Sequence, residues 1–223
     1  MVGNRREHRQ LSSFSGELYT AFPGVVKGKV VLSLWLDSLT NVSDILVTHE
    51  IGHWVLKLQG FRGFIYQPQK HSNAEILLNS MAHHLPLYAL QRSLGHEPQP
   101  EIDSRTLHNT EIFSKQTETK KRQFCIRNAL LLADDLMNCS EQYRTQLEKI
   151  VSKKYPMTAK LLEKILTSAP SYNLLKPDQN LKFCRKVIEA LELGSGWREI
   201  DEAKELISMV DQAQGTKTAD NRG

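Results

Sequence analysis

The 223-residue sequence has little of what would place it in several specialised protein classes. Its three cysteines, Cys125, Cys139 and Cys184, lie far apart and form no CxxC pair, so neither a disulfide scaffold nor a thiolate metal site is expected. No apolar run approaches the roughly 18 to 20 residues of a membrane-spanning helix, and residues 1–10 are polar, without the apolar segment of a signal peptide. We therefore expect a cytoplasmic protein that does not associate with membranes.

An excess of one charge is also missing. The 29 Lys and Arg residues stand against 25 Asp and Glu residues, which gives a formal net charge of +4. This charge is too small and too dispersed to predict nucleic-acid binding, so nucleic acid is not an expected partner. The chain is 40% hydrophobic and 24% charged, which is typical of a globular protein, and its length allows one or two domains.

The first hundred residues predict a mixture of strand and helix. The β-branched run over residues 25–36 predicts a strand, which a turn at Lys27 and Gly28 divides into a short hairpin. Asn41, Ser43 and Asp44 are helix-capping types, and apolar and histidine side chains then recur at helical spacing for about four turns. A second helix is expected from residue 72, where the sequence SNAE has the form of a capping box.

The rest of the chain has a different character. Pro86 should kink or end the second helix, and the Gly95/Pro98/Pro100 break is a candidate domain boundary. Beyond it, helical periodicity predicts five helices. We therefore predict an α+β protein with a small N-terminal α/β domain at residues 1–100, an all-α bundle at residues 101–213 and a flexible tail at residues 214–223.

The predicted first helix contains an HExxH motif, His49-Glu50-Ile51-Gly52-His53. Residues four apart share one face of a helix, so His49 and His53 can bind one Zn²⁺ ion, and Glu50 can reach a water molecule beside it. Zinc lowers the pKa of such a water, and a glutamate can take its proton as general base before the attack on a carbonyl. The motif predicts a zinc metallopeptidase that hydrolyses peptide or protein substrates.

A catalytic zinc usually has three protein ligands and one open position. Leu56 and Gln59 stand where the metzincin motif has glycine and histidine, which excludes that branch. Glu75 follows His53 by 22 residues, on the second predicted helix. With this glutamate, residues 25–95 resemble the gluzincin metallopeptidases of the zincin superfamily and, more loosely, small intracellular zincin-type regulatory peptidases.

The resemblance implies a zincin-like fold for the N-terminal domain, with His49, His53 and Glu75 as zinc ligands and Glu50 as the catalytic base. Asn79, one turn after Glu75, would take the place of a family carboxylate that bonds the first histidine. Tyr66 would point its hydroxyl at an oxyanion, as a family tyrosine does.

Alternatives remain at several of these positions. Glu75 is also the glutamate of the predicted capping box and could bond the backbone of Ser72 instead of a metal. His71, His83 and His84 compete with it as third ligand, although the last two also fit a polar helix face or a supporting role. The strand at residues 29–36 could bind a peptide along its edge, or it could be buried inside a sheet.

A second function class fits the same motif. Only 48 residues precede His49, which is short for a zincin N-terminal subdomain, and the C-terminal half has no histidine motif for an additional catalytic group. These departures favour a proteolytically inactive, zincin-like binding or regulatory protein with a structural zinc as the alternative to the peptidase.

Overall fold

Helices dominate the structure, a computed structural model that describes residues 19–26, 29–36, 43–67, 72–208 and 211. Helix 202–208 ends the described part of the chain, apart from residue 211. The preceding elements are β1 (Tyr19–Val26), β2 (Lys29–Leu36), α2 (Asp44–Leu58), β3 (Gly63–Tyr66), α3 (Ser72–Ser93), α4 (Gln99–Lys115), α5 (Arg122–Asn138), α6 (Glu141–Lys154), α7 (Pro156–Ser168), the 3₁₀ turn η2 (Ala169–Ser171), α8 (Pro177–Ala190) and β4 (Trp197–Ile200).

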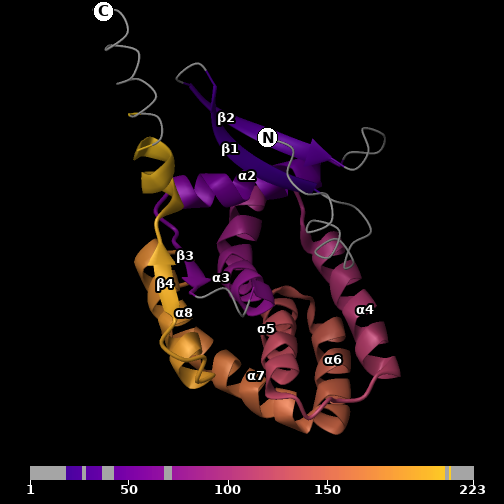
Figure 1. The fold of residues 1–223 in the computed structure, drawn as a ribbon. Helices are drawn as coiled ribbons and strands as arrows, with labels where there is room; N and C mark the ends of the chain where they lie inside the picture. The colour runs from indigo at the N-terminus through magenta and orange to yellow at the C-terminus, as the bar shows by residue number, and fades with distance from the viewer. Residues whose placement is uncertain (1–18, 27–28, 37–42, 68–71, 209–210, 212–223) are drawn as a thin grey trace, which may run out of the picture.

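The predicted α+β class is confirmed, with two small antiparallel sheets of two strands each. β1 pairs with β2 as a hairpin, from Tyr19 opposite Leu36 to Val26 opposite Lys29. β3 pairs with β4, which comes from the far end of the chain. The hairpin lies on one side of α2, and helices α3 to α8 lie on the opposite side (Figure 1). No helix among the described residues is long and apolar enough to cross a membrane.

One large core joins the two halves of the chain. Its buried side chains come from β3, α3, α4, α5, α6, α7 and α8, so they lie on both sides of residue 100. The members with no exposed surface are Leu78, Met81, Ala82, Ala129, Leu130, Leu132, Ala133, Leu147, Ile165, Phe183, Val187 and Leu191. Residues on both sides of the predicted boundary near residue 100 therefore share this core, and the division into two domains stays a prediction.

The helices agree with the sequence-based prediction in part. α2, α5, α6, α7 and α8 are present as expected, whereas α4 was not predicted. The predicted all-α character of residues 101–213 is wrong at Trp197–Ile200, because this segment forms β4 and the last helix begins only at residue 202.

Pro86 lies inside α3 and does not end it. A proline has no N–H to donate to the carbonyl four residues earlier, which here is that of Ala82. The buried side chain of Asn180, from α8, donates its Nδ2–H to the Ala82 oxygen at 2.6 Å. A side chain distant in sequence thus replaces the missing helical hydrogen bond, which explains why α3 continues to Ser93.

Candidate metal centre

Three histidines from two helices form the candidate site. His49 and His53 lie on α2 and His84 lies on α3, and one ring nitrogen of each is within 4.8 Å of one in each of the others. The ring centroids are 5.0 Å apart for His49 and His53, 5.2 Å for His49 and His84, and 5.6 Å for His53 and His84. Among the described residues, this is the group of His, Cys, Asp and Glu side chains that could hold a metal ion.

Local interactions fix the helix that carries His49 and His53. Ser43 caps α2 by accepting the Ile45 N–H at 3.2 Å. Gln91, fully buried on α3, donates to the Ile45 carbonyl at 2.9 Å and ties the first turn of α2 to α3. These contacts hold α2 in a set register against α3.

Gly52, in the middle of the HExxH motif, lets the two helices approach closely. A Cβ atom at this position would lie 2.3 Å from Cδ1 of Leu87, which is fully buried on α3. Such a distance is far below van der Waals contact, so a side chain here would require Leu87 or the helices themselves to shift. The glycine therefore helps His49 and His53 reach His84.

The environment keeps the α2 histidines neutral. Burial, reinforced by His84 and Arg105, lowers the pKa of His49 to about 3. Burial also lowers the pKa of His53 well below its ordinary value, and His49 and His84 add to this effect. Neutral imidazoles carry the lone pair that a metal requires, so both rings are available as ligands near neutral pH.

His84 has a carboxylate partner on its other side. Its Nδ1 lies 2.6 Å from Oδ2 of Asp134, a buried residue of α5. Burial alone would raise the pKa of Asp134, but Arg105 and His84 outweigh it and lower this pKa to about 2. An ionised carboxylate only accepts hydrogen bonds, so Nδ1 is the donor in this contact and Nε2 is the ring nitrogen that could bind a metal.

Arg105 of α4 connects several buried groups behind His84. Its guanidinium lies 3.2 Å from Asp134 and 3.0 Å from Asp135, and it donates to the Tyr88 hydroxyl at 3.0 Å. Asn109 also donates to Asp135, at 2.6 Å. The Tyr88 ring stacks on His84 with centroids 5.3 Å apart and an angle of 29° between the planes. The candidate site therefore extends from α2 and α3 into α4 and α5.

Glu75, the expected third ligand, is outside this group. Its Oε2 accepts the backbone N–H of Tyr66 at 3.0 Å. Nine residues separate Glu75 from His84 on α3, and nine residues are two and a half helical turns, which puts the two side chains on opposite faces. A single helix cannot present both to α2, so the structure brings His84 to His49 and His53 instead.

Asn79 likewise bonds β3 and not the first histidine. Its amide accepts the Phe64 N–H and donates to the Phe64 carbonyl, both at 2.9 Å. His83, one turn further along α3, has its Nε2 3.1 Å from the Arg62 carbonyl oxygen. Glu75, Asn79 and His83 thus form a row of polar side chains on α3, four residues apart. Side chains four residues apart on a helix are about 6 Å apart along its axis, close to the span of two strand residues. The α3 row therefore matches alternate residues along one edge of β3.

The remaining predicted residues have mixed outcomes. Glu50 is half-buried on α2, directly after His49. The Tyr66 ring packs against Trp197 with centroids 5.5 Å apart, and its predicted role toward an oxyanion stays a prediction. His71 lies outside the described residues.

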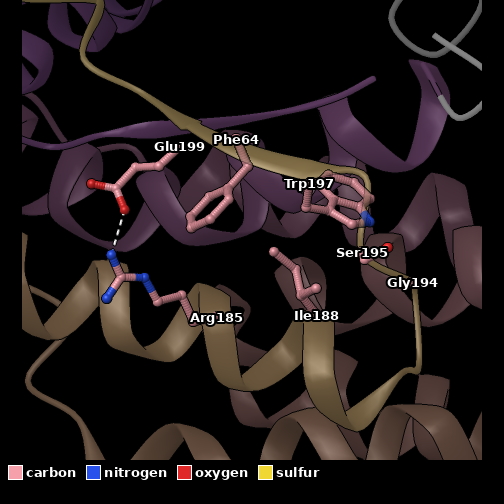
Figure 2. A pocket seen from close by; sticks show the side chains of 7 residues that line it. All are labelled: Phe64, Arg185, Ile188, Gly194, Ser195, Trp197 and Glu199. Atoms are coloured by element: carbon pink, nitrogen blue, oxygen red, sulfur yellow. Dashed lines mark hydrogen bonds and ion pairs between the residues drawn. The ribbon is translucent and has the colours of Figure 1, made fainter. Parts of the chain in front are cut away.

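A separate pocket of about 290 Å³ lies between β3, β4 and α8 (Figure 2). Phe64, Trp197 and Ile188 form apolar walls, and an ion pair of 2.5 Å between Arg185 and Glu199 closes one end. Gly194 and Ser195 complete the lining, which includes none of the three histidines. This pocket is distinct from the candidate metal centre.

The comparisons with known proteins leave the site to be interpreted from its own geometry. No family model matches the chain, and neither the curated proteins nor the solved structures include a match.

From the sequence, His84 was one alternative for the third metal ligand, and no role was predicted for Asp134, Arg105 or Tyr88. One signal was available, since Asp134 and Asp135 interrupt the apolar segment LLLADDLM of α5. Charged residues are almost never buried without a partner, so two adjacent acids on an apolar helix predict a buried polar site.

Proposed function

We propose that the chain is a zinc metallopeptidase of HExxH type in which His49, His53 and His84 hold the metal. The convergence of three ring nitrogens within 4.8 Å supports this proposal. Donors around one tetrahedral zinc are about 3.4 Å apart, and small side-chain rotations would close the remaining difference. Three imidazole ligands suit zinc and leave a fourth coordination position for water or substrate.

Zinc bound at this site would supply a Lewis acid that makes a water molecule more acidic and a substrate carbonyl more electrophilic. Glu50 would accept a proton from that water and deliver it to the leaving amine, which an amide needs because an amine anion leaves poorly. The packing of α2 against α3 would hold the rings of His49 and His53 in place. The single observation that carries the proposal is an HExxH helix whose two histidines meet a third.

The β hairpin offers a place for an extended peptide. In the described part of the chain β2 pairs only with β1, and both strands pack against α2. A peptide lying along the open edge of β2 could form backbone hydrogen bonds there. The zincin-like character of residues 1–100 and the peptide substrate are both parts of this proposal.

Glu50→Gln should keep zinc and lose peptide hydrolysis, because an amide cannot take the proton from water. Zinc content by atomic spectroscopy and cleavage of a broad peptide library would be measured on the wild type and this variant. A Glu50→Gln protein that still cleaves peptides at the wild-type rate would remove the peptidase assignment.

The same preparation can decide between His84 and Glu75 as third ligand. We expect His84→Ala to lose most zinc and Glu75→Gln to keep it, because the glutamine amide oxygen can still accept the Tyr66 N–H. If the His84→Ala protein keeps its zinc and the Glu75→Gln protein loses it, Glu75 is the third ligand. Stoichiometric zinc without any peptide cleavage by the wild type would favour the alternative, a binding or regulatory protein with a structural zinc.

A further inference from the structure

We propose that Arg105 and Asp134 are positioning residues that fix His84 for metal binding, so that helices α4 and α5 set the third ligand of the centre. This inference rests on the metal centre proposed above and not on the reaction. Neither residue belongs to the HExxH segment, and Asp134 is 50 residues away from His84 in the sequence.

The first constraint acts in the plane of the imidazole ring. The 2.6 Å contact between Nδ1 of His84 and Oδ2 of Asp134 sets the ring's rotation and assigns the proton to Nδ1. Nε2 is then the nitrogen left to bind a metal. A charged hydrogen-bond partner also makes the imidazole a stronger donor to the metal.

The second constraint acts on the face of the ring. Tyr88 stacks on His84, and its hydroxyl accepts a hydrogen bond from Nη1 of Arg105 at 3.0 Å. Arg105 also lies 3.2 Å from Asp134. One guanidinium therefore holds both groups that hold His84, one in the plane of the ring and one against its face.

Asp135 contacts the same guanidinium. It is fully buried and lies 3.0 Å from Arg105, and Asn109 donates to its other carboxylate oxygen at 2.6 Å. Arg105 is therefore held by a second acid as well as by Asp134, which limits the movement of the side chain that holds the partners of His84.

The experiment measures Co²⁺ affinity and the visible absorption spectrum of the Co²⁺ protein, without any substrate. We expect Asp134→Asn and Arg105→Met to bind Co²⁺ about 10- to 100-fold more weakly than the wild type, with a shifted spectrum. Arg105→Lys should lie between them and the wild type, because an ammonium cannot contact Asp134 and Tyr88 with the geometry of the planar fork. The double variant should lose little more than the weaker-binding single variant, since both substitutions disturb one network.

Asp103→Asn is the matched control. Asp103 lies on α4, as Arg105 does, but its carboxylate accepts the Ser140 N–H at 2.8 Å and has no contact with the histidine network. This variant should lose stability while keeping Co²⁺ affinity and spectrum. Nitrogen NMR of the metal-free wild type should show the His84 proton on Nδ1, and in Asp134→Asn this preference should weaken.

The outcomes separate this inference from the proposed function. A wild type that binds Co²⁺ and cleaves no peptide ends the peptidase proposal and leaves the positioning role intact. Conversely, an active wild type whose Asp134→Asn and Arg105→Lys variants bind Co²⁺ as tightly as it does, with the same spectrum, overturns the positioning role. Lower thermal stability with unchanged Co²⁺ binding also overturns it, because that result defines a structural network.

Discussion

His83 and His84 are neighbours in the sequence but have different surroundings. His83 bonds the backbone before β3, whereas His84 meets His49, His53 and Asp134. Adjacent residues on a helix point about 100° apart, so one side chain can support a strand while the next contributes to a metal site. The identity of the residue alone does not distinguish these roles.

The buried histidines should make the metal-free protein sensitive to acid. Burial lowers the pKa of His83 from 6.5 to about 4, against the opposing effect of its bond to the Arg62 carbonyl. Between these two pH values the unfolded chain binds a proton that the folded chain does not. The free energy of unfolding should therefore fall as the pH drops from about 6.5 toward 4, by at most about 1.4 kcal/mol per pH unit for each such histidine.

The test compares urea unfolding of the wild type and His83→Gln from pH 7 to pH 4 in the presence of a chelator. Glutamine can donate to the Arg62 carbonyl but does not titrate, so the variant should lose less stability over this range. Equal pH dependence of the two proteins would show that His83 is not one of the groups responsible.

At the scale of the element, α3 serves different neighbours with different rows of side chains. Glu75, Asn79 and His83 face the edge of β3, and His84 with Tyr88 faces the metal site and α4. Their spacing of four residues keeps each row on one side of the helix. α3 packs against α2, β3, α5 and α8, which leaves little freedom to shift it.

The approach of α2 to α3 predicts a specific effect of Gly52→Ala. Alanine favours a helix by about 1 kcal/mol over glycine, but its methyl group would collide with Leu87, and such overpacking costs about 1 to 3 kcal/mol. We expect zinc affinity to fall roughly tenfold, because His49 and His53 move away from His84.

Isothermal titration with zinc would measure this effect, with Leu58→Ala as the control. Leu58 is on the same helix and is 62% exposed, so its truncation should leave zinc binding unchanged. Combining Gly52→Ala with Leu87→Ala should recover part of the affinity, since the collision is then relieved. An unchanged zinc affinity in Gly52→Ala alone would mean that the close approach does not control the site.

The elements could be predicted from the sequence where their signals are local. The capping serine and the HExxH spacing act within a few residues, and α2 and β2 agree with the prediction. β1 begins at Tyr19, before the predicted run at residues 25–36, and the turn predicted at residues 27–28 lies outside the described residues. The helix end considered at Pro86 does not occur, because Asn180 bonds the Ala82 carbonyl that the proline leaves without a donor. Asn180 is 98 residues away from Ala82 in the sequence. Residues 197–200 form a strand because they pair with β3, and helical periodicity carries no trace of that pairing.

At the scale of the whole molecule, the candidate metal centre and the main core depend on the same helices. α3 and α5 supply His84 and Asp134 to the site and also supply Leu78, Met81, Leu130 and Leu132 to the core. The sequence predicted two of the three histidines, because they share a motif. His84 was one of several alternatives for the third ligand, and the sequence does not pair it with Asp134, Arg105 and Tyr88, since these side chains come together only when four helices pack.

The shared core predicts one cooperative unfolding transition. Differential scanning calorimetry should give equal calorimetric and van't Hoff enthalpies. Leu132→Ala, a fully buried position on α5, should destabilise the protein by about 2 to 5 kcal/mol and move the whole transition to lower temperature. Two separate transitions, only one of which responds to Leu132→Ala, would instead support independent domains that meet near residue 100.

The row of side chains on α3 also affects how copies of the protein meet in concentrated solution. An open strand edge can pair with a strand of another molecule and start aggregation. Glu75 and Asn79 occupy hydrogen-bonding groups along one edge of β3, His83 bonds Arg62 just before it, and β4 occupies the other edge. In the described part of the chain, self-association by strand pairing is therefore directed away from β3, to the outer edges of β1, β2 and β4, which have no strand beside them.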